Sequence, residues 1–183
     1  MISGRRDAVL VDALFTKDEA RDLGNWIAAS GKNLTTVYIT HGHSDHYFGL
    51  TTLLQQFPDA KAVALPAIAA AIDPTGQSLS SVSGAKAMFG DQIPDEPIRP
   101  KPMDGHKTDL RGHELLAMEI GQSDAEISTI LYVPSLNAVV AGDIANHDVH
   151  VNVAATNRAQ RQEWIGTLNK IGELNPQTVV GRA

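Results

Sequence analysis

Cysteine is missing from this sequence of 183 residues, and so are long basic runs. Without cysteine, disulfides, thiolate metal sites and cysteine nucleophiles are excluded. A metal must then be held by His, Asp or Glu, and a nucleophile must be oxygen-based. The 15 Lys and Arg stand against 21 Asp and Glu, for a formal net charge of -6, and the longest basic run is Arg5-Arg6. This balance argues against a nucleic acid or an anionic membrane surface as the main partner.

Long apolar segments are also missing. The longest stretches, such as residues 60–72, are too short and too interrupted to cross a bilayer. The charged Arg5-Arg6-Asp7 lies where a signal peptide would need its apolar region. We therefore expect a cytoplasmic protein. Because 43% of the residues are hydrophobic, the chain can bury one sizeable core, and we expect a single domain over residues 1–183.

Short apolar runs alternate with amphipathic segments along most of the chain. The runs predict buried strands at residues 8–11, 35–40, 61–65, 114–120, 128–133, 137–141 and 178–180. The amphipathic segments predict helices near residues 16–31, 50–57, 66–72, 81–89 and 157–174. The first should begin with a capping box at Thr16 and Glu19. The predicted apolar faces are Leu23, Trp26 and Ile27 for the first helix, and Trp164, Ile165, Leu168 and Ile171 for the last. Residues 73–109 are interrupted by prolines, and we expect an irregular covering segment that packs through Ile93, Ile98 and Met103. The alternation predicts an α/β layered fold.

Four possible metal ligands fall within six residues, directly after the strand predicted at residues 35–40. They are His41, His43, Asp45 and His46. Two imidazoles at i and i+2 can converge on one ion, while the last two residues can point toward a second position. Imidazole and carboxylate suit a borderline divalent cation, so the pattern predicts Zn(II), with Mn(II) or Fe(II) as alternatives.

This stretch also resembles a known family. His41-Gly42-His43-Ser44-Asp45-His46 matches the H-x-H-x-D-H signature of the metallo-β-lactamase-fold hydrolases. Asp12 resembles the family's structural aspartate at a strand end, and Asp143 resembles its metal-bridging aspartate in a later Gly-Asp element. The resemblance implies an α/β fold of the metallo-β-lactamase type, an αβ/βα sandwich, which we expect to be incomplete at both termini.

The sequence departs from the family pattern at two ligand positions. The family's Gly-His-Ser/Thr element is replaced by Gly121-Gln122-Ser123, and a carboxamide is a weak zinc ligand. Its later Gly-His has no counterpart in the final stretch, Thr178-Val179-Val180-Gly181-Arg182-Ala183. The resemblance then leaves His41, His43 and Asp143 for one position, and Asp45, His46 and Asp143 for the other. Two imidazoles and one carboxylate are a recognised catalytic zinc set, so one or two ions are implied.

Four further histidines lie outside the motif. His147 and His150 follow Asp143 and would compensate for a missing ligand if their loop folded back, although a plain loop position is favoured. His106 and His113 lie in a polar stretch, and we expect both to be solvated.

Two functions follow from these residues. The first is a metal-dependent hydrolase, in which a metal-bound water attacks a small ester, thioester, lactone, amide or phosphoester and Asp45 is the candidate general base. The second is a non-catalytic or weakly metal-binding descendant of the fold that acts as a binding or interaction protein. A homodimer would cover sheet edges left open by trimming at the two ends.

Overall fold

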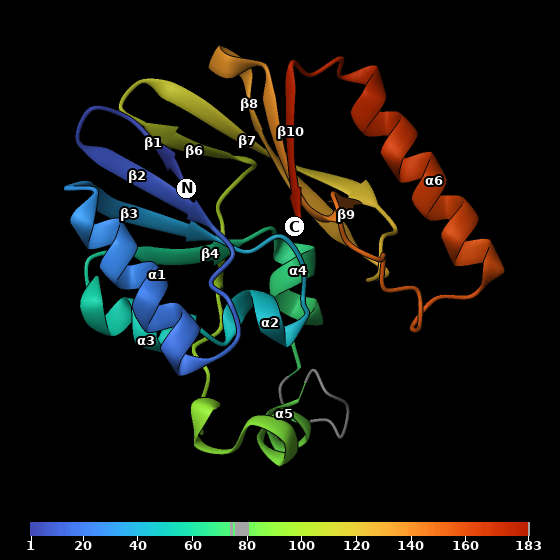
Figure 1. The fold of residues 1–183 in the computed structure, drawn as a ribbon. Helices are drawn as coiled ribbons and strands as arrows, with labels where there is room; N and C mark the ends of the chain where they lie inside the picture. The colour runs from blue at the N-terminus through green and yellow to red at the C-terminus, as the bar shows by residue number, and fades with distance from the viewer. Residues whose placement is uncertain (74, 76–80, 183) are drawn as a thin grey trace. The chain divides into compact units, whose positions relative to one another are not determined.

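The computed structural model describes residues 1–73, 75 and 81–182. The chain forms two compact units, Met1–Met103 and Asp104–Ala183, and each contains one five-stranded sheet (Figure 1). The expectation of a single domain over residues 1–183 stays a prediction. Within the described ranges, no helix combines the length and the apolar character that a membrane crossing requires, and the cytoplasmic location also stays a prediction.

The sheet of the first unit has the strand order β1-β2-β3-β4-β5. Its strands are β1 (Ile2–Ser3), β2 (Asp7–Val11), β3 (Asn33–Tyr38), β4 (Lys61–Ala64) and β5 (Lys101–Pro102). β1 is antiparallel to β2, and all the other pairs are parallel. The predicted strands at residues 8–11, 35–40 and 61–65 are confirmed to within a few residues. β1 and β5 were not predicted, because two residues are too few to show a hydrophobic period.

Five helices belong to the described part of this unit: α1 (Lys17–Ala29), α2 (Ser44–Tyr47), α3 (Leu50–Gln56), α4 (Pro66–Ala71) and α5 (Val82–Phe89). α1 begins with the predicted capping box, since Thr16 Oγ1 accepts a hydrogen bond from the Glu19 amide and Glu19 Oε2 accepts one from the Thr16 amide. α1 packs against α3 (Figure 1). Ile27 is buried, whereas Trp26, which we expected on the same apolar face, is exposed.

The segment between the two sheets is partly as expected. The predicted helix is present as α5, with Ser81 as its cap, and Ile93 and Met103 are buried. The packing predicted for Ile98 is wrong, because its side chain is exposed and only its amide is held, by Thr51 Oγ1. Residues 74 and 76–80 of this segment lie outside the described residues.

The sheet of the second unit has the order β10-β9-β8-β7-β6. Its strands are β6 (Lys107–Leu110), β7 (His113–Gly121), β8 (Ser128–Val133), β9 (Ala138–Asn146) and β10 (Thr178–Arg182). The first four are joined antiparallel, and β10 runs parallel to β9 after the crossover helix α6 (Arg158–Glu173). The predicted strands are confirmed, and β9 continues beyond residue 141 through Asp143 to Asn146. β6 lies within the segment predicted to be irregular.

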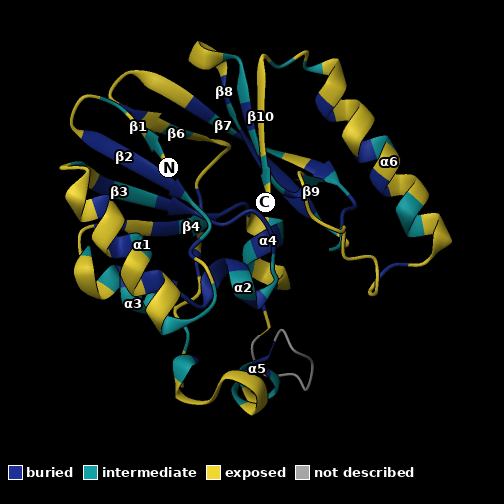
Figure 2. Cartoon of the chain, in the orientation of Figure 1, coloured by how far each residue is buried: buried dark blue, intermediate teal, exposed yellow. Residues whose placement is uncertain are grey.

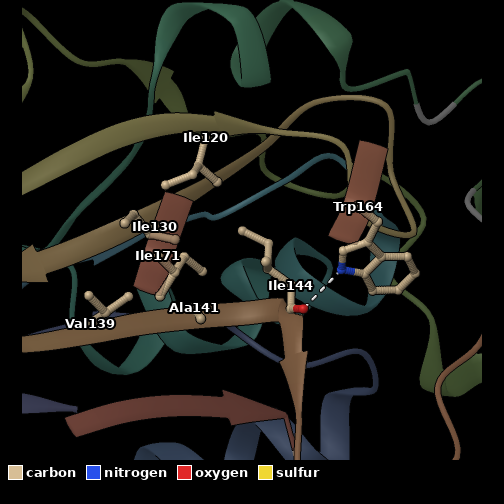
Figure 3. Packing of buried hydrophobic residues seen from close by; sticks show 7 residues of the cluster. All are labelled: Ile120, Ile130, Val139, Ala141, Ile144, Trp164 and Ile171. Atoms are coloured by element: carbon tan, nitrogen blue, oxygen red, sulfur yellow. Dashed lines mark hydrogen bonds between the residues drawn. The ribbon is translucent and has the colours of Figure 1, made fainter. Parts of the chain in front are cut away.

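The core of the second unit lies between α6 and its sheet (Figures 2 and 3). It contains Ile120, Ile130, Val139, Ala141, Ile144, Trp164 and Ile171. The Trp164 indole Nε1 donates a hydrogen bond of 2.9 Å to the Ile144 carbonyl, which fixes α6 to β9 (Figure 3). The expectation that Ile165 and Leu168 share the buried face of α6 is wrong. The buried residues of α6 are Trp164, Thr167 and Ile171, a narrow stripe, and both other side chains are exposed.

The backbone of the loop after β2 is hydrogen-bonded to the backbone just before α3. The Gly49 amide donates to the Leu14 carbonyl, and the Ala13 amide donates to the His46 carbonyl at 2.7 Å. A Cβ on Gly49 would lie 1.9 Å from the Ala13 carbonyl oxygen. Glycine is therefore required at this position for space rather than for its backbone angles, because its φ of -63° suits any residue.

We expect Gly49→Ala to lower the free energy of unfolding by about 1–3 kcal/mol, because the added methyl group forces two backbone segments apart. Chemical denaturation measures this change. Gly166→Ala is the matched control, since nothing lies within 4 Å of the added Cβ and alanine in a helix stabilises by about 0.5–1 kcal/mol. Similar stabilities for Gly49→Ala and the parent would contradict the close approach.

Candidate metal centre

The four residues of the predicted ligand motif lie where β3 gives way to α2. His41 and His43 belong to the extended stretch after β3, and His43 is the N-cap of α2 with φ -73° and ψ 144°. Asp45 and His46 follow in the single turn of α2 itself. The change from extended to helical backbone turns successive side chains back on one another. His41 and His46 are buried, while His43 and Asp45 are partly exposed.

The structure brings the three imidazoles of the motif together. The ring centroids of His41 and His46 are 4.0 Å apart, and those of His41 and His43 are 4.7 Å apart. The Asp45 carboxylate joins them, with Oδ2 3.7 Å from His46 Nε2. Three imidazoles and one carboxylate gathered in this way form a donor set that suits a borderline divalent cation.

Asp12 and Thr40 orient two of these rings. Asp12 Oδ2 lies 2.8 Å from His46 Nδ1. The same carboxylate accepts hydrogen bonds from the Thr40 amide at 2.8 Å and from the Thr40 hydroxyl at 2.9 Å. The Thr40 hydroxyl in turn lies 3.1 Å from His41 Nδ1. Asp12 is thus linked to both buried imidazoles, directly to one and through a hydroxyl to the other.

This network decides which ring nitrogen faces a metal. An ionised carboxylate only accepts, so the 2.8 Å approach of Asp12 Oδ2 to His46 Nδ1, which is not aligned as a hydrogen bond, favours the proton on Nδ1. The Thr40 hydroxyl gives its single proton to Asp12 and therefore accepts from His41 Nδ1. In the neutral rings Nε2 then carries the lone pair, so Nε2 is the atom that each ring can offer to a metal. Because the Nε2 atoms of His41 and His46 are both available as donors in this arrangement, the motif fits a divalent cation.

Asp12 was singled out only by resemblance, and the role of Thr40 was missed altogether. The sequence carried one signal for Thr40, its place directly before His41, but a β-branched residue at the end of an apolar run is also an ordinary strand residue. Asp12 has a left-handed φ of 60°. This conformation, uncommon outside glycine, marks a position held by its surroundings.

Tyr47 directly follows the motif and is fully buried. Burial raises the pKa of its phenol to about 12, with the Asp73 carboxylate raising it further and Arg99 opposing the shift. The phenol therefore stays neutral, and its ring packs edge-to-face against Phe48 at 5.0 Å. Tyr47 is a packing residue that supports α2.

In the second unit, Asp143 lies on β9 and its side chain is only 7% exposed. Its Oδ2 accepts a charge-assisted hydrogen bond of 2.6 Å from Arg182 Nη1, on β10. The Asn146 side chain donates to the Asp143 carbonyl. Sequence reasoning noted position 182 only as one that lacks a histidine, and it did not foresee this ion pair.

Gln122 is buried just after β7, and its amide nitrogen donates to the carbonyls of Ser123 and Ala125 at 2.8 and 3.1 Å. These bonds close the turn after Gly121 and hold the side-chain nitrogen toward its own loop. The amide oxygen therefore points away from that loop. The proposed place of Gln122 at a ligand position stays a prediction.

The four remaining histidines lie outside the ligand motif. His106 and His113 are exposed, as expected. His147 and His150 are exposed as well, and His147 pairs with Asp148 at 3.2 Å. Their position agrees with the favoured interpretation of plain loop residues.

Comparison with known proteins identifies the family. The sequence profile of the metallo-beta-lactamase superfamily matches residues 1–182, so the chain belongs to this superfamily. No curated protein sequence matches the chain. The resemblance to this family is therefore confirmed, and so is the predicted α/β fold of the metallo-β-lactamase type, while the expected incompleteness at both termini stays a prediction.

Solved structures share this fold at low identity. A metallo-beta-lactamase family protein from Thermus thermophilus is 18% identical, with a TM-score of 0.67 over 98% of this chain and 65% of its own. TTHA1623 in a di-iron-bound form is 18% identical, with a TM-score of 0.68 and coverage of 96% and 81%. The mono-zinc form of FIM-1 from Pseudomonas aeruginosa is 16% identical, with a TM-score of 0.63 and coverage of 98% and 72%. The chain thus spans less than two thirds of the first of these relatives.

We expect Asp12→Asn to weaken zinc binding about 10–100-fold, because a carboxamide no longer fixes the tautomer of His46. Calorimetric titration of the metal-free protein measures the affinity. Asp7→Asn is the matched control, as Asp7 is buried at the other end of β2 and bonds Asn33. Equal affinities of the two variants would rule out the orienting role of Asp12.

We expect Gln122→His to bind zinc more tightly than the parent, because imidazole is a better zinc ligand than a carboxamide. The same titration applies, with the exposed Gln162→His on α6 as the control for an added histidine. No gain over that control would place residue 122 away from the metal.

Proposed function

We propose that this chain is a metal-dependent hydrolase acting on a small ester, thioester, lactone, amide or phosphoester. The superfamily supplies a hydrolase-like fold. The observation that carries the proposal is the connection of Asp12 to both buried imidazoles. Asp12 lies directly beside Nδ1 of His46, and the Thr40 hydroxyl links it to Nδ1 of His41. Imidazoles oriented by a carboxylate at the nitrogen away from the ion are typical of metal sites.

The proposed ligands are those of the sequence motif. His41 and His43 together with Asp143 would hold one ion, and Asp45 and His46 with Asp143 would serve a second position. Zinc is the proposed metal, with Mn(II) or Fe(II) as alternatives. When bound, such an ion polarises a substrate oxygen and lowers the pKa of a water to roughly 7.

The protein's own groups supply the remaining steps. When the second position is empty, Asp45, which is partly exposed beside the Nε2 of His46, can accept a proton from a water and pass it to the leaving group. His41 and His46 keep their orientation through Asp12 and undergo no rearrangement during the reaction. Preorganisation of this kind lowers the barrier, because no free energy is needed to align the groups at the moment of reaction.

A second candidate is a non-catalytic, weakly metal-binding member of the superfamily that acts as a binding or interaction protein. Two observations favour it: Asp143 is engaged by Arg182, and the amide nitrogen of Gln122 is committed to its own loop. Each of these contacts ties a residue at a proposed ligand position into the local structure.

Metal content and turnover together test the proposal. The protein is purified without chelator, its metal is measured by elemental analysis, and hydrolysis is assayed on activated esters, thioesters, lactones and phosphodiesters. Bound zinc with turnover that disappears on chelation supports the hydrolase. Bound zinc without turnover on any of these classes supports the second candidate.

We expect Asp45→Asn to keep its zinc and to lose activity by about a hundredfold or more, because the variant keeps the shape but removes the base. Zinc stoichiometry and turnover are measured on the same samples. Asp22→Asn, an exposed position of α1, is the control for loss of one negative charge. Activity equal to the parent's would exclude Asp45 as the base.

A further inference from the structure

We propose that Arg182 provides the positive charge that a second metal ion would supply at Asp143, and that the protein therefore binds one ion per chain. This inference rests on the proposed function, since it assigns the number of metals at the same site. It follows from the ion pair within the second unit.

The Arg182–Asp143 pair differs from the exposed ion pairs of this unit in burial. Its two atoms are 2.6 Å apart, and the aspartate side chain is 7% exposed, whereas that of Arg182 is 51% exposed. By contrast, the Lys107–Glu114 pair on β6 and β7 joins side chains that are 62% and 57% exposed. A buried carboxylate needs a positive partner, whereas an exposed pair contributes little. Arg182 is therefore a charge partner of Asp143 and not an incidental surface contact.

The backbone holds this pair in place. The register of β10 on β9 shifts where Gly181 lies opposite Gly142 and Arg182 lies opposite Asn146. The Arg182 carbonyl accepts from the His147 amide at 2.9 Å. A Cβ on Gly181 would lie 2.1 Å from the Ala145 carbonyl oxygen, so the strands approach closely just before Arg182. The bulge at residues 143–145 thus brings the guanidinium back toward Asp143.

The chemistry of the pair opposes a second dication. Guanidinium remains protonated at any physiological pH and cannot serve as a metal ligand. A metal that bound Oδ2 would compete with the guanidinium for that oxygen and would lie close to its positive charge. Arg182 thus supplies a cation at Asp143 and offers no ligand atom.

The consequence for the rest of the site is a division of roles. His41 and His43 retain the proposed metal-binding role, while Asp143 accepts from Arg182 through Oδ2. Asp45 and His46 are no longer required as ligands of a second ion. Asp45 is then available as a base, and His46 remains a positioning residue held by Asp12.

Metal stoichiometry tests the inference independently of activity. Parent, Arg182→His, Arg182→Lys and Lys107→His are loaded with excess zinc, freed of unbound metal and measured by elemental analysis and native mass spectrometry. We expect about one ion per chain for the parent, for Arg182→Lys and for Lys107→His, and about two for Arg182→His, which offers a ligand in place of a cation. Lys107→His controls for a histidine added at an exposed ion pair of the same unit.

Calorimetry provides the second readout, and thermal unfolding shows that each variant is folded. Arg182→Gln, which keeps an N–H donor but no charge, should show a second, weaker binding event. Two ions in the parent, or a single ion in both Arg182→His and Arg182→Gln, would overturn the role of Arg182 while leaving the hydrolase proposal in place. No ion in any of the proteins would overturn both.

Discussion

The first unit depends on one carboxylate. Asp12 accepts hydrogen bonds from the backbone and hydroxyl of Thr40 and contacts the ring of His46, so it ties the ends of β2 and β3 to α2. Such a partly buried carboxylate is stabilised when its acceptor sites are filled. The close approach of Ala13 to His46 and of Leu14 to Gly49 provides the backbone frame in which this happens. Orientation of the imidazoles is therefore a property of the fold and not of the histidines alone.

In the second unit the main electrostatic feature is the buried carboxylate of Asp143. Asp143 is carried on a strand with a bulge, beside a core that α6 closes through Trp164. A buried negative charge there has to be neutralised by a metal, a proton or a basic side chain. Arg182 does so within the chain. The two units thus differ. The first orients imidazoles that can bind a cation, whereas the second contains its own cation, the Arg182 guanidinium.

Local patterns predicted most of the elements. The capping box at Thr16 and Glu19 and the apolar run at residues 8–11 specify their helix and strand through short-range interactions, and the spacing of the motif predicted that its histidines converge. Other features depend on long-range register. The contact of Arg182 with Asp143 needs β10 to shift against β9 across a gap of 39 residues, which no local pattern encodes. Ile165 and Leu168 on α6 were expected to be buried and are exposed, because hydrophobicity alone does not show which side of a stripe meets the sheet.

The charge balance of the Arg182–Asp143 pair does not depend on the concentration of any ion in solution. A metal ion leaves its site whenever its free concentration falls below the dissociation constant, whereas a guanidinium attached to the chain cannot dissociate from the protein. Its effective concentration at Asp143 is fixed by the β9–β10 pairing. The neutralisation of this carboxylate is consequently independent of how much metal the surroundings contain, and scarcity of metal leaves the second unit with its charges still balanced.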